Sequence, residues 1–393
     1  MRILHTSDWH LGKNFFSKKL TEVQRRLFEE EFFHLVKDVQ PDLVLVTGDV
    51  VDKPAPDYET LELLKDILLF LGKNKVKSIF ILGNHDSKRV SLYKEFFKEL
   101  GIMFVDDLEG LVSPIEVCGD SQDRVWIYSL PYMNFYELKE RSKTLSQGLF
   151  KGVMGSEISF LRDAVKWVVK NTCVYLKRPC IFLGHFAVDK GFFSGEETSL
   201  TTVGMEEIIP SEVVKDFDLV CLGHLHRAQK LGNKIFYSGS PMPYSFEESR
   251  FKKGVWLFEL KAGKLVNTEF VELSPPVEIK VKKGKFEELL FSKPDEAFVK
   301  VVLTDKTPVM KPFERLKTVF PNLLVLEYEE DFEGDELPEV EFKSVGSLSL
   351  NEKELFESFL EFLKVSDKAE LVTSFVKVLE EFKQEKEALM IKG

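Results

Sequence analysis

The amino-acid sequence predicts an α/β fold in which strands buried on both faces alternate with helices. The first observation is a set of short apolar runs, rich in Val, Ile, Leu and Phe, that each end in a polar residue, usually after a glycine. These runs lack the alternation of a strand that is wetted on one side, and this is typical of strands covered on both faces. The second observation is that helical patterns, such as residues 21–39 and 58–71, lie between the runs. Together they indicate a layered α/β fold, whose ligands collect at the carboxyl ends of the strands.

The predicted elements follow one another in a clear order. The strand-like runs before residue 250 are RILHT, DLVLVT, SIFIL, CIFL and DLVCL. Two more, GVWLFEL and KLVNTEFVEL, precede Pro275 and Pro276, and these consecutive prolines indicate a boundary. Residues 277–328 then predict strand, helix, strand, helix and strand, which would form a small α/β unit. Residues 351–364 and 367–386 carry apolar stripes that predict two C-terminal helices.

We therefore expect four parts: residues 1–275 as the main domain, 276–330 as a small α/β domain, 331–346 as a linker and 347–393 as a helical pair. The linker prediction rests on charge, because nine acidic residues and no Lys or Arg lie between Glu327 and Glu341. Such a segment is extended by self-repulsion. The two short helices cannot bury their apolar stripes by themselves, so they either pack back onto the chain's own domains or dock on a partner.

The composition is that of an ordinary folded protein. The 393 residues are 44% hydrophobic and 30% charged, which argues against a disordered chain. No apolar stretch approaches membrane-spanning length, and the N-terminus lacks the apolar core of a signal peptide. The four cysteines, Cys118, Cys173, Cys180 and Cys221, form no CxxC pair and lie mostly in apolar runs. We expect buried free thiols and a cytoplasmic protein.

The formal net charge of −11 argues at first against a nucleic-acid partner, but its distribution weakens that objection. The acidic segment accounts for most of this charge, and small basic groups are spread along the rest of the chain. They are Lys18, Lys19, Arg25 and Arg26; Lys88 and Arg89; Arg250, Lys252 and Lys253; and Lys280, Lys282 and Lys283. Each group is either a solvated face or a phosphate contact. Charge therefore permits DNA binding without indicating it.

The carboxyl ends of the predicted strands carry the residues suited to metal binding. In chain order these are Asp8 and His10, Asp49, Asn84 and His85, His185, and His224 and His226. Five of the seven histidines belong to this set, and a glycine directly precedes four of its groups. A single histidine is usually a hydrogen-bonded residue near a core, but a series at successive strand ends predicts one shared site. In an extended strand, His224 and His226 would point to the same face.

The ligand types indicate the kind of metal. Carboxylate, imidazole and amide groups without a thiolate suit manganese or iron better than a structural zinc site. The set offers too many ligands for one ion and about the right number for two ions that share a carboxylate. Two ions roughly 3.5–4 Å apart are the arrangement that hydrolyses phosphate esters. We predict a two-metal phosphoesterase that binds two Mn²⁺, with Mg²⁺ or iron as substitutes.

The motifs SDWH, GD, GNHD, GH and GHLH, in this order, resemble those of the calcineurin-like metallophosphoesterases. The resemblance implies a layered β-sandwich flanked by helices. It also implies a division of the ligands in which one ion is held by Asp8, His10 and His226, the other by Asn84, His185 and His224, and both by a bridging Asp49. His85 would not bind metal; it would face the substrate phosphate and donate a proton to the leaving oxygen.

Asp52, in the segment GDVVD, lies where several branches of this family place a carboxylate beside the catalytic histidine. A nearby carboxylate raises the pKa of a histidine and keeps it protonated near neutral pH. The resemblance therefore implies that Asp52 supports His85. The alternative is an aspartate that caps the loop after the strand.

Three longer segments, ILHTSDWHLGKNF, GHLHRAQ and YSGSPMPYSFEE, resemble one branch of the family, the nuclease subunits of bacterial SbcCD complexes. The resemblance implies a manganese-dependent DNA nuclease that acts in repair and recombination. Its substrates would be double-stranded ends, degraded 3′ to 5′, and single strands and hairpins, cut internally. An SbcC-type ATPase would be the partner, bound through the C-terminal helices.

The same resemblance implies further contacts. Residues 276–330 would form a capping domain that contacts DNA, and helices within 58–71 and 91–100 would form a homodimer. The lysines of the first capping strand are then either an electrostatic footprint for DNA or the protection of an exposed edge strand. Two alternative functions remain at this point. One is a phosphodiesterase for a small molecule or nucleotide, and the other is a binding scaffold on an inactive phosphoesterase fold.

Overall fold

The computed structural model describes residues 1–92, 94–119, 123–146, 154–155, 158–194, 208–329, 372–373 and 375. The chain divides into two compact units, Met1–Glu330 and Asp331–Gly393. The predicted linker, residues 331–346, and nearly all of the predicted helical pair, 347–393, lie outside the described residues. Every predicted metal ligand belongs to the first unit.

Two six-stranded sheets form most of this unit. The first has the order β14-β13-β1-β4-β5-β6 and consists of β1 (Arg2–Thr6), β4 (Leu43–Thr47), β5 (Lys77–Ile81), β6 (Ile102–Val105), β13 (Gly254–Lys261) and β14 (Lys264–Glu272). The second has the order β11-β12-β10-β9-β8-β7 and consists of β7 (Ile115–Cys118), β8 (Arg124–Leu130), β9 (Cys180–His185), β10 (Leu219–Gly223), β11 (Gln229–Leu231) and β12 (Ile235–Tyr237). The central strands of both sheets are parallel, so within each sheet their carboxyl ends lie at one edge.

The central strands are apolar on both faces because both faces are covered. Leu43 and Leu45 of β4 lie in the core between the two sheets, together with Leu183 of β9. Val44 and Val46, the alternate residues of β4, belong to a second core on the outer face of the first sheet. This packing explains the continuous apolar runs. The predicted class, a β-sandwich flanked by helices, is confirmed.

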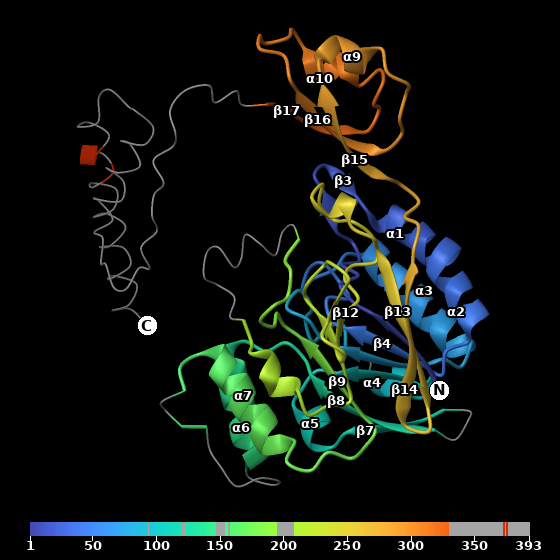
Figure 1. Cartoon of the computed structure of the whole chain (residues 1–393), viewed down its shortest axis with the longest axis vertical. Helices are drawn as coiled ribbons and strands as arrows, with labels where there is room; N and C mark the ends of the chain where they lie inside the picture. The colour runs from blue at the N-terminus through green and yellow to red at the C-terminus, as the bar shows by residue number, and fades with distance from the viewer. Residues whose placement is uncertain are drawn as a thin grey trace. The chain divides into compact units, whose positions relative to one another are not determined.

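Helices cover both outer faces of the sandwich (Figure 1). The side of the first sheet carries α1 (Thr21–Leu27), α2 (Phe33–Val39), α3 (Tyr58–Lys73) and the short α4 (Lys94–Lys98). The side of the second sheet carries α5 (Glu109–Val112), α6 (Phe135–Ser146) and α7 (Leu161–Thr172). A π-helical turn, Phe28–Phe32, joins α1 to α2, so the predicted helix over residues 21–39 is continuous. Within the described ranges, the 3₁₀ turns are Ser211–Val214 and Glu248–Arg250.

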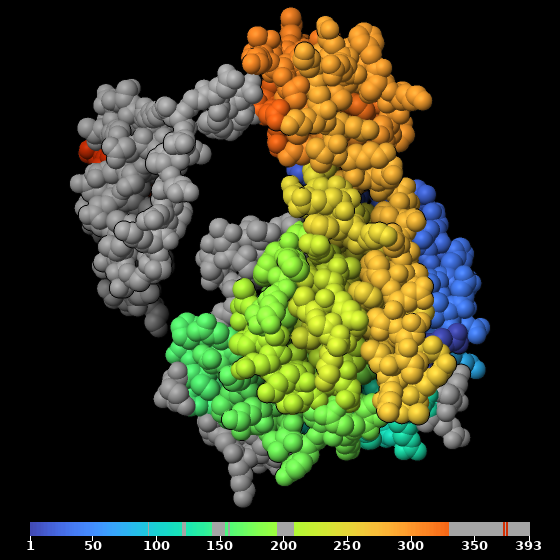
Figure 2. Space-filling view, in the orientation of Figure 1, coloured from blue at the N-terminus to red at the C-terminus, as the bar shows by residue number. Residues whose placement is uncertain are grey.

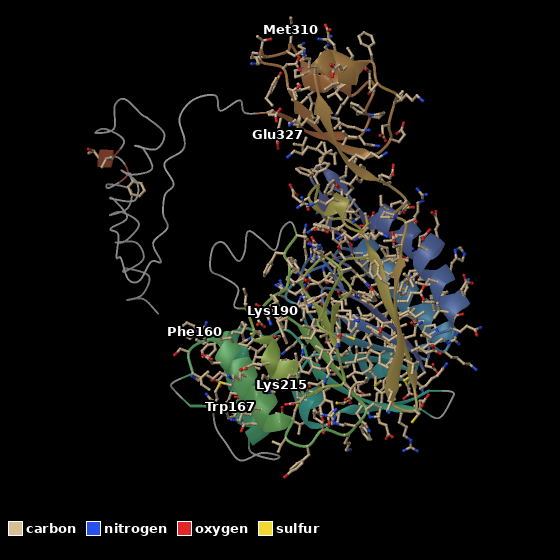
Figure 3. All side chains as sticks on the ribbon, in the orientation of Figure 1. Phe160, Trp167, Lys190, Lys215, Met310 and Glu327 are labelled. Atoms are coloured by element: carbon tan, nitrogen blue, oxygen red, sulfur yellow. The ribbon has the colours of Figure 1, made fainter. Side chains whose placement is uncertain are left out.

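The small α/β unit has the predicted order of elements. They are β15 (Ile279–Gly284), α9 (Phe286–Leu290), β16 (Phe298–Leu303), α10 (Pro312–Leu316) and β17 (Leu323–Tyr328). The three strands form a parallel sheet with a core of its own that includes Val299, Val301 and Leu316. Met310 and Glu327, labelled in Figure 3, belong to this unit. Phe298 stacks on Phe15 of the short hairpin β2 (Asn14–Phe15) and β3 (Lys18–Lys19), at 5.9 Å between ring centroids. The division into domains at residue 275 stays a prediction.

All four cysteines are free, as predicted, but they are not all buried. Cys180 and Cys221 are buried in central strands, whereas Cys173 is half-buried and Cys118 is exposed. Cys118 ends β7, the edge strand of the second sheet, which pairs only with β8 among the strands of the described residues. Among the described residues, no helix is both long and apolar enough to span a membrane.

Candidate metal centre

The predicted ligands come together where the carboxyl ends of five parallel strands meet. Asp8 and His10 follow β1, Asp49 follows β4, and Asn84 and His85 follow β5 of the first sheet. His185 ends β9, and His224 and His226 follow β10 of the second sheet. Backbone hydrogen bonds hold the loops together, including one from Asp8 N to Gly48 O at 3.0 Å and one from His10 N to Asp49 O at 2.9 Å. Figure 2 shows the surface of the molecule, where residues 208–275 cover much of the face that is turned toward the viewer.

The first group consists of Asp8, His10 and His226, whose ligand atoms all lie within 4.8 Å of one another. Nε2 of His10 lies 3.1 Å from Nε2 of His226. The Asp8 carboxylate also accepts a hydrogen bond from the backbone N–H of His224 at 2.9 Å. All three side chains are almost fully buried.

The second group consists of Asn84, His185 and His224. Oδ1 of Asn84 lies 2.9 Å from Nε2 of His185 and 3.2 Å from Nδ1 of His224. The Asp49 carboxylate lies between the two groups, because its Oδ2 is 3.5 Å from Nε2 of His10 and 3.3 Å from Nε2 of His185. These distances place Asp49 where the resemblance puts a bridging ligand.

The arrangement fits divalent metal ions on two grounds. First, the donor set consists of carboxylate, imidazole and amide groups, which suits manganese, iron or magnesium better than a thiolate-rich set would. Second, two buried imidazole nitrogens, Nε2 of His10 and Nε2 of His226, face each other at 3.1 Å while Nδ1 of His226 donates to Glu248. Because Nδ1 of His10 lies 3.3 Å from the Asp52 carboxylate, both Nε2 atoms can offer a lone pair to a cation between them.

His85 and Asp52 are neighbours: a carboxylate oxygen of Asp52 lies within 4.8 Å of a ring nitrogen of His85, while the hydrogen bond between the two residues runs to the backbone of Asp52. Nδ1 of His85 lies 3.0 Å from the backbone oxygen of Asp52, to which it donates. The Asp52 carboxylate lies 3.3 Å from Nδ1 of His10 and 3.1 Å from Nζ of Lys13. Burial alone would raise the pKa of Asp52, but His10 and the Lys13 ammonium lower it to about 2. The sequence could not show this, because it does not reveal which atom of Asp52 turns toward His85.

Four candidate ligands have a left-handed backbone, which is uncommon outside glycine. The φ angles are 51° for Asp8, 42° for His10, 50° for Asp49 and 93° for His224. Such conformations cost on the order of 1–3 kcal/mol each and persist where the surrounding structure enforces them. Here the loop-to-loop hydrogen bonds do so, and the strain turns each side chain sharply out of its strand toward the centre.

Two glycines permit the close approach of these loops. A Cβ on Gly48 would lie 2.2 Å from Nδ1 of His185, and Gly48 also has a φ of +93°. A Cβ on Gly83 would lie 2.2 Å from Oδ1 of Asp49. The glycines that the sequence places before the ligands are therefore needed for backbone approach.

Asp86, the last residue of the motif GNHD, ties two of the ligand loops together. Its carboxylate accepts hydrogen bonds from the backbone N–H groups of Val50, Val51 and Gly83 at 3.1, 2.9 and 2.9 Å. Burial and the negative charge of Asp49 raise its pKa to about 6. The carboxylate thus links the loop of Asp49 to the loop of Asn84.

Several supporting residues could not be recognised in the sequence. Gln24 of α1 is fully buried, and its amide donates to the backbone oxygens of Trp9 and His10 at 3.1 and 2.8 Å. Glu248 accepts from Nδ1 of His226 at 3.0 Å and from Lys253 at 2.5 Å. The nearest signal in the sequence is the segment YSGSPMPYSFEE, which contains Glu248, but nothing in it indicates contact with His226.

Most of the basic groups turn out to be ion-paired. Lys253 is buried against Glu248, Lys280 and Lys282 pair with Asp295 at 3.2 Å, and Lys283 pairs with Glu329. Lys19, Arg25, Arg26, Lys88 and Lys252 also have acidic partners. By contrast, no carboxylate of the described ranges lies within ion-pairing distance of Arg89, Arg227 or Arg250. The lysines of β15 are thus paired with carboxylates, whereas Arg227 directly follows His226, a candidate ligand.

Comparison with known proteins agrees with this geometry. A calcineurin-like phosphoesterase family model matches residues 1–228, which is more than half of the chain, and a type 5 capsule protein repressor C-terminal domain model matches residues 275–363. The chain is 30% identical over 333 residues to a Staphylococcus epidermidis protein named as the D subunit of the nuclease SbcCD, a match that covers 83% of this chain and 85% of that protein. A Staphylococcus saprophyticus protein of the same name is 28% identical over 333 residues, with 83% and 84% covered. The chain therefore belongs to the calcineurin-like phosphoesterases and, within them, to the family of the SbcCD nuclease subunits to which these relatives belong.

Proposed function

We propose that this protein is a manganese-dependent DNA nuclease that hydrolyses phosphodiesters with two metal ions. The observation that carries the proposal is the meeting of all seven predicted ligands and His85 at one edge of the two sheets. An inactive scaffold would have no need of this complete set. The proposed substrates are double-stranded ends, degraded 3′ to 5′, and single strands and hairpins, cut internally by a protein that acts in the cytoplasm.

Each residue would have a distinct task in this reaction. When bound, the two metal ions supply an activated water and neutralise charge on the phosphoryl oxygens. Asp8, His10 and His226 would hold one ion, Asn84, His185 and His224 the other, and Asp49 both. His85 would act as the doubly protonated imidazolium: Nδ1 donates to the backbone oxygen of Asp52, and Nε2 would give its proton to the departing 3′ oxygen. Asp52 would orient His85 through its backbone oxygen, and its carboxylate lies 3.3 Å from Nδ1 of His10 and within 4.8 Å of a ring nitrogen of His85.

The proposed partners are an SbcC-type ATPase, bound by the C-terminal helices, and a second copy of this chain. The names of the curated relatives support the first, because they describe one subunit of an SbcCD nuclease. Exposed apolar side chains support the second: Tyr58 and Leu61 on α3 are 72% and 46% exposed, and Leu92 and Phe96 near α4 are each 67% exposed. Both pairs lie on the two helical segments proposed for the dimer.

The test is cleavage of end-labelled duplex and hairpin DNA with manganese, with magnesium and with a chelator. A His85→Gln variant should bind two metal ions and lose cleavage, because its side chain cannot deliver the proton. His34→Gln is the matched control, since His34 is an exposed helical histidine outside the ligand set. Intact DNA together with rapid hydrolysis of a small phosphodiester would instead identify a small-molecule phosphodiesterase.

A further inference from the structure

Glu248 is a fully buried carboxylate that belongs to neither predicted ligand group. It begins the 3₁₀ turn Glu248–Arg250, and its side chain has no exposed surface. Oε1 accepts a hydrogen bond from Nδ1 of His226 at 3.0 Å. Oε2 accepts from Nζ of Lys253 at 2.5 Å, from Oγ of Ser240 at 3.2 Å and from the backbone N–H of Tyr244 at 3.3 Å. Both oxygens are therefore satisfied, one of them by the imidazole.

A buried charge is costly unless it is paired and hydrogen-bonded. Lys253, whose side chain is 2% exposed, supplies the pairing. The same ammonium donates to the backbone oxygen of His226 at 2.8 Å and to Oγ of Ser240 at 2.7 Å. Glu248 thus holds the side chain of His226 by a hydrogen bond, and Lys253 holds its backbone oxygen.

The hydrogen bond from His226 fixes how this imidazole is oriented. A neutral histidine carries one ring proton, and here Nδ1 carries it because the acceptor is a carboxylate. The lone pair of Nε2 then points toward Nε2 of His10, 3.1 Å away. A carboxylate behind a ligand histidine also makes the imidazole a stronger donor to a metal.

The other group of ligands has a weaker support of this kind. Nδ1 of His185 donates to the backbone oxygen of Thr47 at 2.8 Å, which is a neutral acceptor. His226 therefore differs from His185 in having a full negative charge behind it. This difference makes the effect of Glu248 specific to one of the two ion positions.

We propose that Glu248, held ionised by Lys253, is a positioning residue that sets the affinity of the ion bound by Asp8, His10 and His226. The proposal rests on the proposed function of these three residues as metal ligands. Loss of the carboxylate should lower the affinity for that ion and leave the affinity for the ion at Asn84, His185 and His224 nearly unchanged.

The experiment is a titration of Mn²⁺ into the metal-free full-length chain, followed by calorimetry and fitted to two sites. Glu248→Gln should lower the affinity for one Mn²⁺ by about 10- to 100-fold and change the affinity for the other by less than about threefold. Glu247→Gln is the matched control, because Glu247 is the exposed neighbour with the same chemistry, and it should leave both affinities unchanged.

Glu248→Gln leaves Lys253 buried without its counter-charge, so a second variant separates folding from metal binding. In Glu248→Gln/Lys253→Gln both charges are gone, and the same selective loss of one Mn²⁺ is expected. Unchanged affinities in a folded variant, or an equal weakening of both ions that follows the melting temperature, would overturn the proposal. A wild-type chain that binds two Mn²⁺ but cuts no DNA would refute the proposed nuclease function and leave this proposal standing.

Discussion

Left-handed backbone at Asp8, His10, Asp49 and His224 concentrates strain at the candidate metal centre. None of these residue types favours a positive φ as glycine does, so the strain must be offset elsewhere. The backbone bonds between the loops of Asp8 and Gly48 and of His10 and Asp49 are part of that compensation. Each ligand is consequently held in place before a metal binds, and small changes in these loops should matter.

Gly83→Ala tests the close approach of two loops. The added Cβ would lie 2.2 Å from Oδ1 of Asp49 and 2.4 Å from its backbone nitrogen, so the bridging carboxylate must move. We expect Mn²⁺ affinity to fall on the order of 100-fold at both ion positions. Gly284→Ala is the control, because its nearest neighbour would lie at an ordinary 3.6 Å. Equal behaviour of the two variants in a metal titration would contradict the prediction.

Glu248 also predicts a pH dependence of stability for the metal-free protein. Burial raises its pKa, but the charge of Lys253 and the hydrogen bond from His226 lower it from 4.5 to about 2. A carboxylate whose pKa is lowered on folding stabilises the fold above the unfolded value and loses that effect as the pH falls toward the folded value. About 3 kcal/mol of unfolding free energy should therefore disappear between about pH 4.5 and 2.

The measurement is urea unfolding across that pH range in the presence of a chelator. Glu247→Gln should follow the wild-type curve. Glu248→Gln should be less stable at neutral pH, and its free energy of unfolding should change less with pH in acid. A Glu248→Gln curve parallel to wild type would show that this carboxylate is not the group responsible.

Among the elements, strands and long helices were predictable, and supporting contacts were not. The apolar runs identify β1, β4, β5, β9 and β10 because both of their faces are buried, and the ligands follow because they end these strands. The helix over residues 21–39 follows from its period. Gln24 could not be predicted, because 220 positions separate it from Tyr244. Glu248 could not be predicted, because nothing in the sequence shows that its side chain turns inward to His226. Likewise, no sequence pattern tells that the Asp52 carboxylate turns toward His10.

The connection between β10 and β11 carries an arginine suited to DNA. Arg227 directly follows His226, and its guanidinium lies 4.6 Å from the ring centre of Phe251 and 5.3 Å from that of Phe192, which is 59% exposed. Arginine held flat by aromatic rings is preorganised to meet phosphates or unstacked bases. We expect Arg227→Gln to raise the KM for hairpin DNA by about 10-fold and leave Mn²⁺ binding unchanged.

Lys230→Gln serves as the control for this prediction, because Lys230 is an exposed cation in the neighbouring strand whose ammonium lies over Phe236. A steady-state assay of hairpin cleavage distinguishes the two variants. If Arg227→Gln loses metal instead of substrate, the side chain supports His226 and does not contact DNA.

At the scale of the whole molecule, residues 1–330 form one compact unit that contains every proposed ligand. We therefore expect removal of residues 331–393 to leave manganese-dependent hairpin cleavage within about threefold of the full chain, because every proposed ligand lies within residues 1–330. The same truncation should abolish co-purification with an SbcC-type ATPase. Loss of cleavage in a folded truncated chain would show that the C-terminal segment contributes to the reaction itself.

The long sequence separation between the proposed ligands has a consequence for the synthesis of the protein. His10 and His226 are 216 positions apart, and the carboxylate behind His226 comes later still. A ribosome making this protein releases Asp8, His10 and their neighbour Asp49 early, yet His226 and the carboxylate of Glu248 emerge only after most of the second sheet has been made. A nascent chain therefore has no complete metal centre before that turn is made. A nuclease assembled in this order cannot acquire its activity while most of it is still being translated.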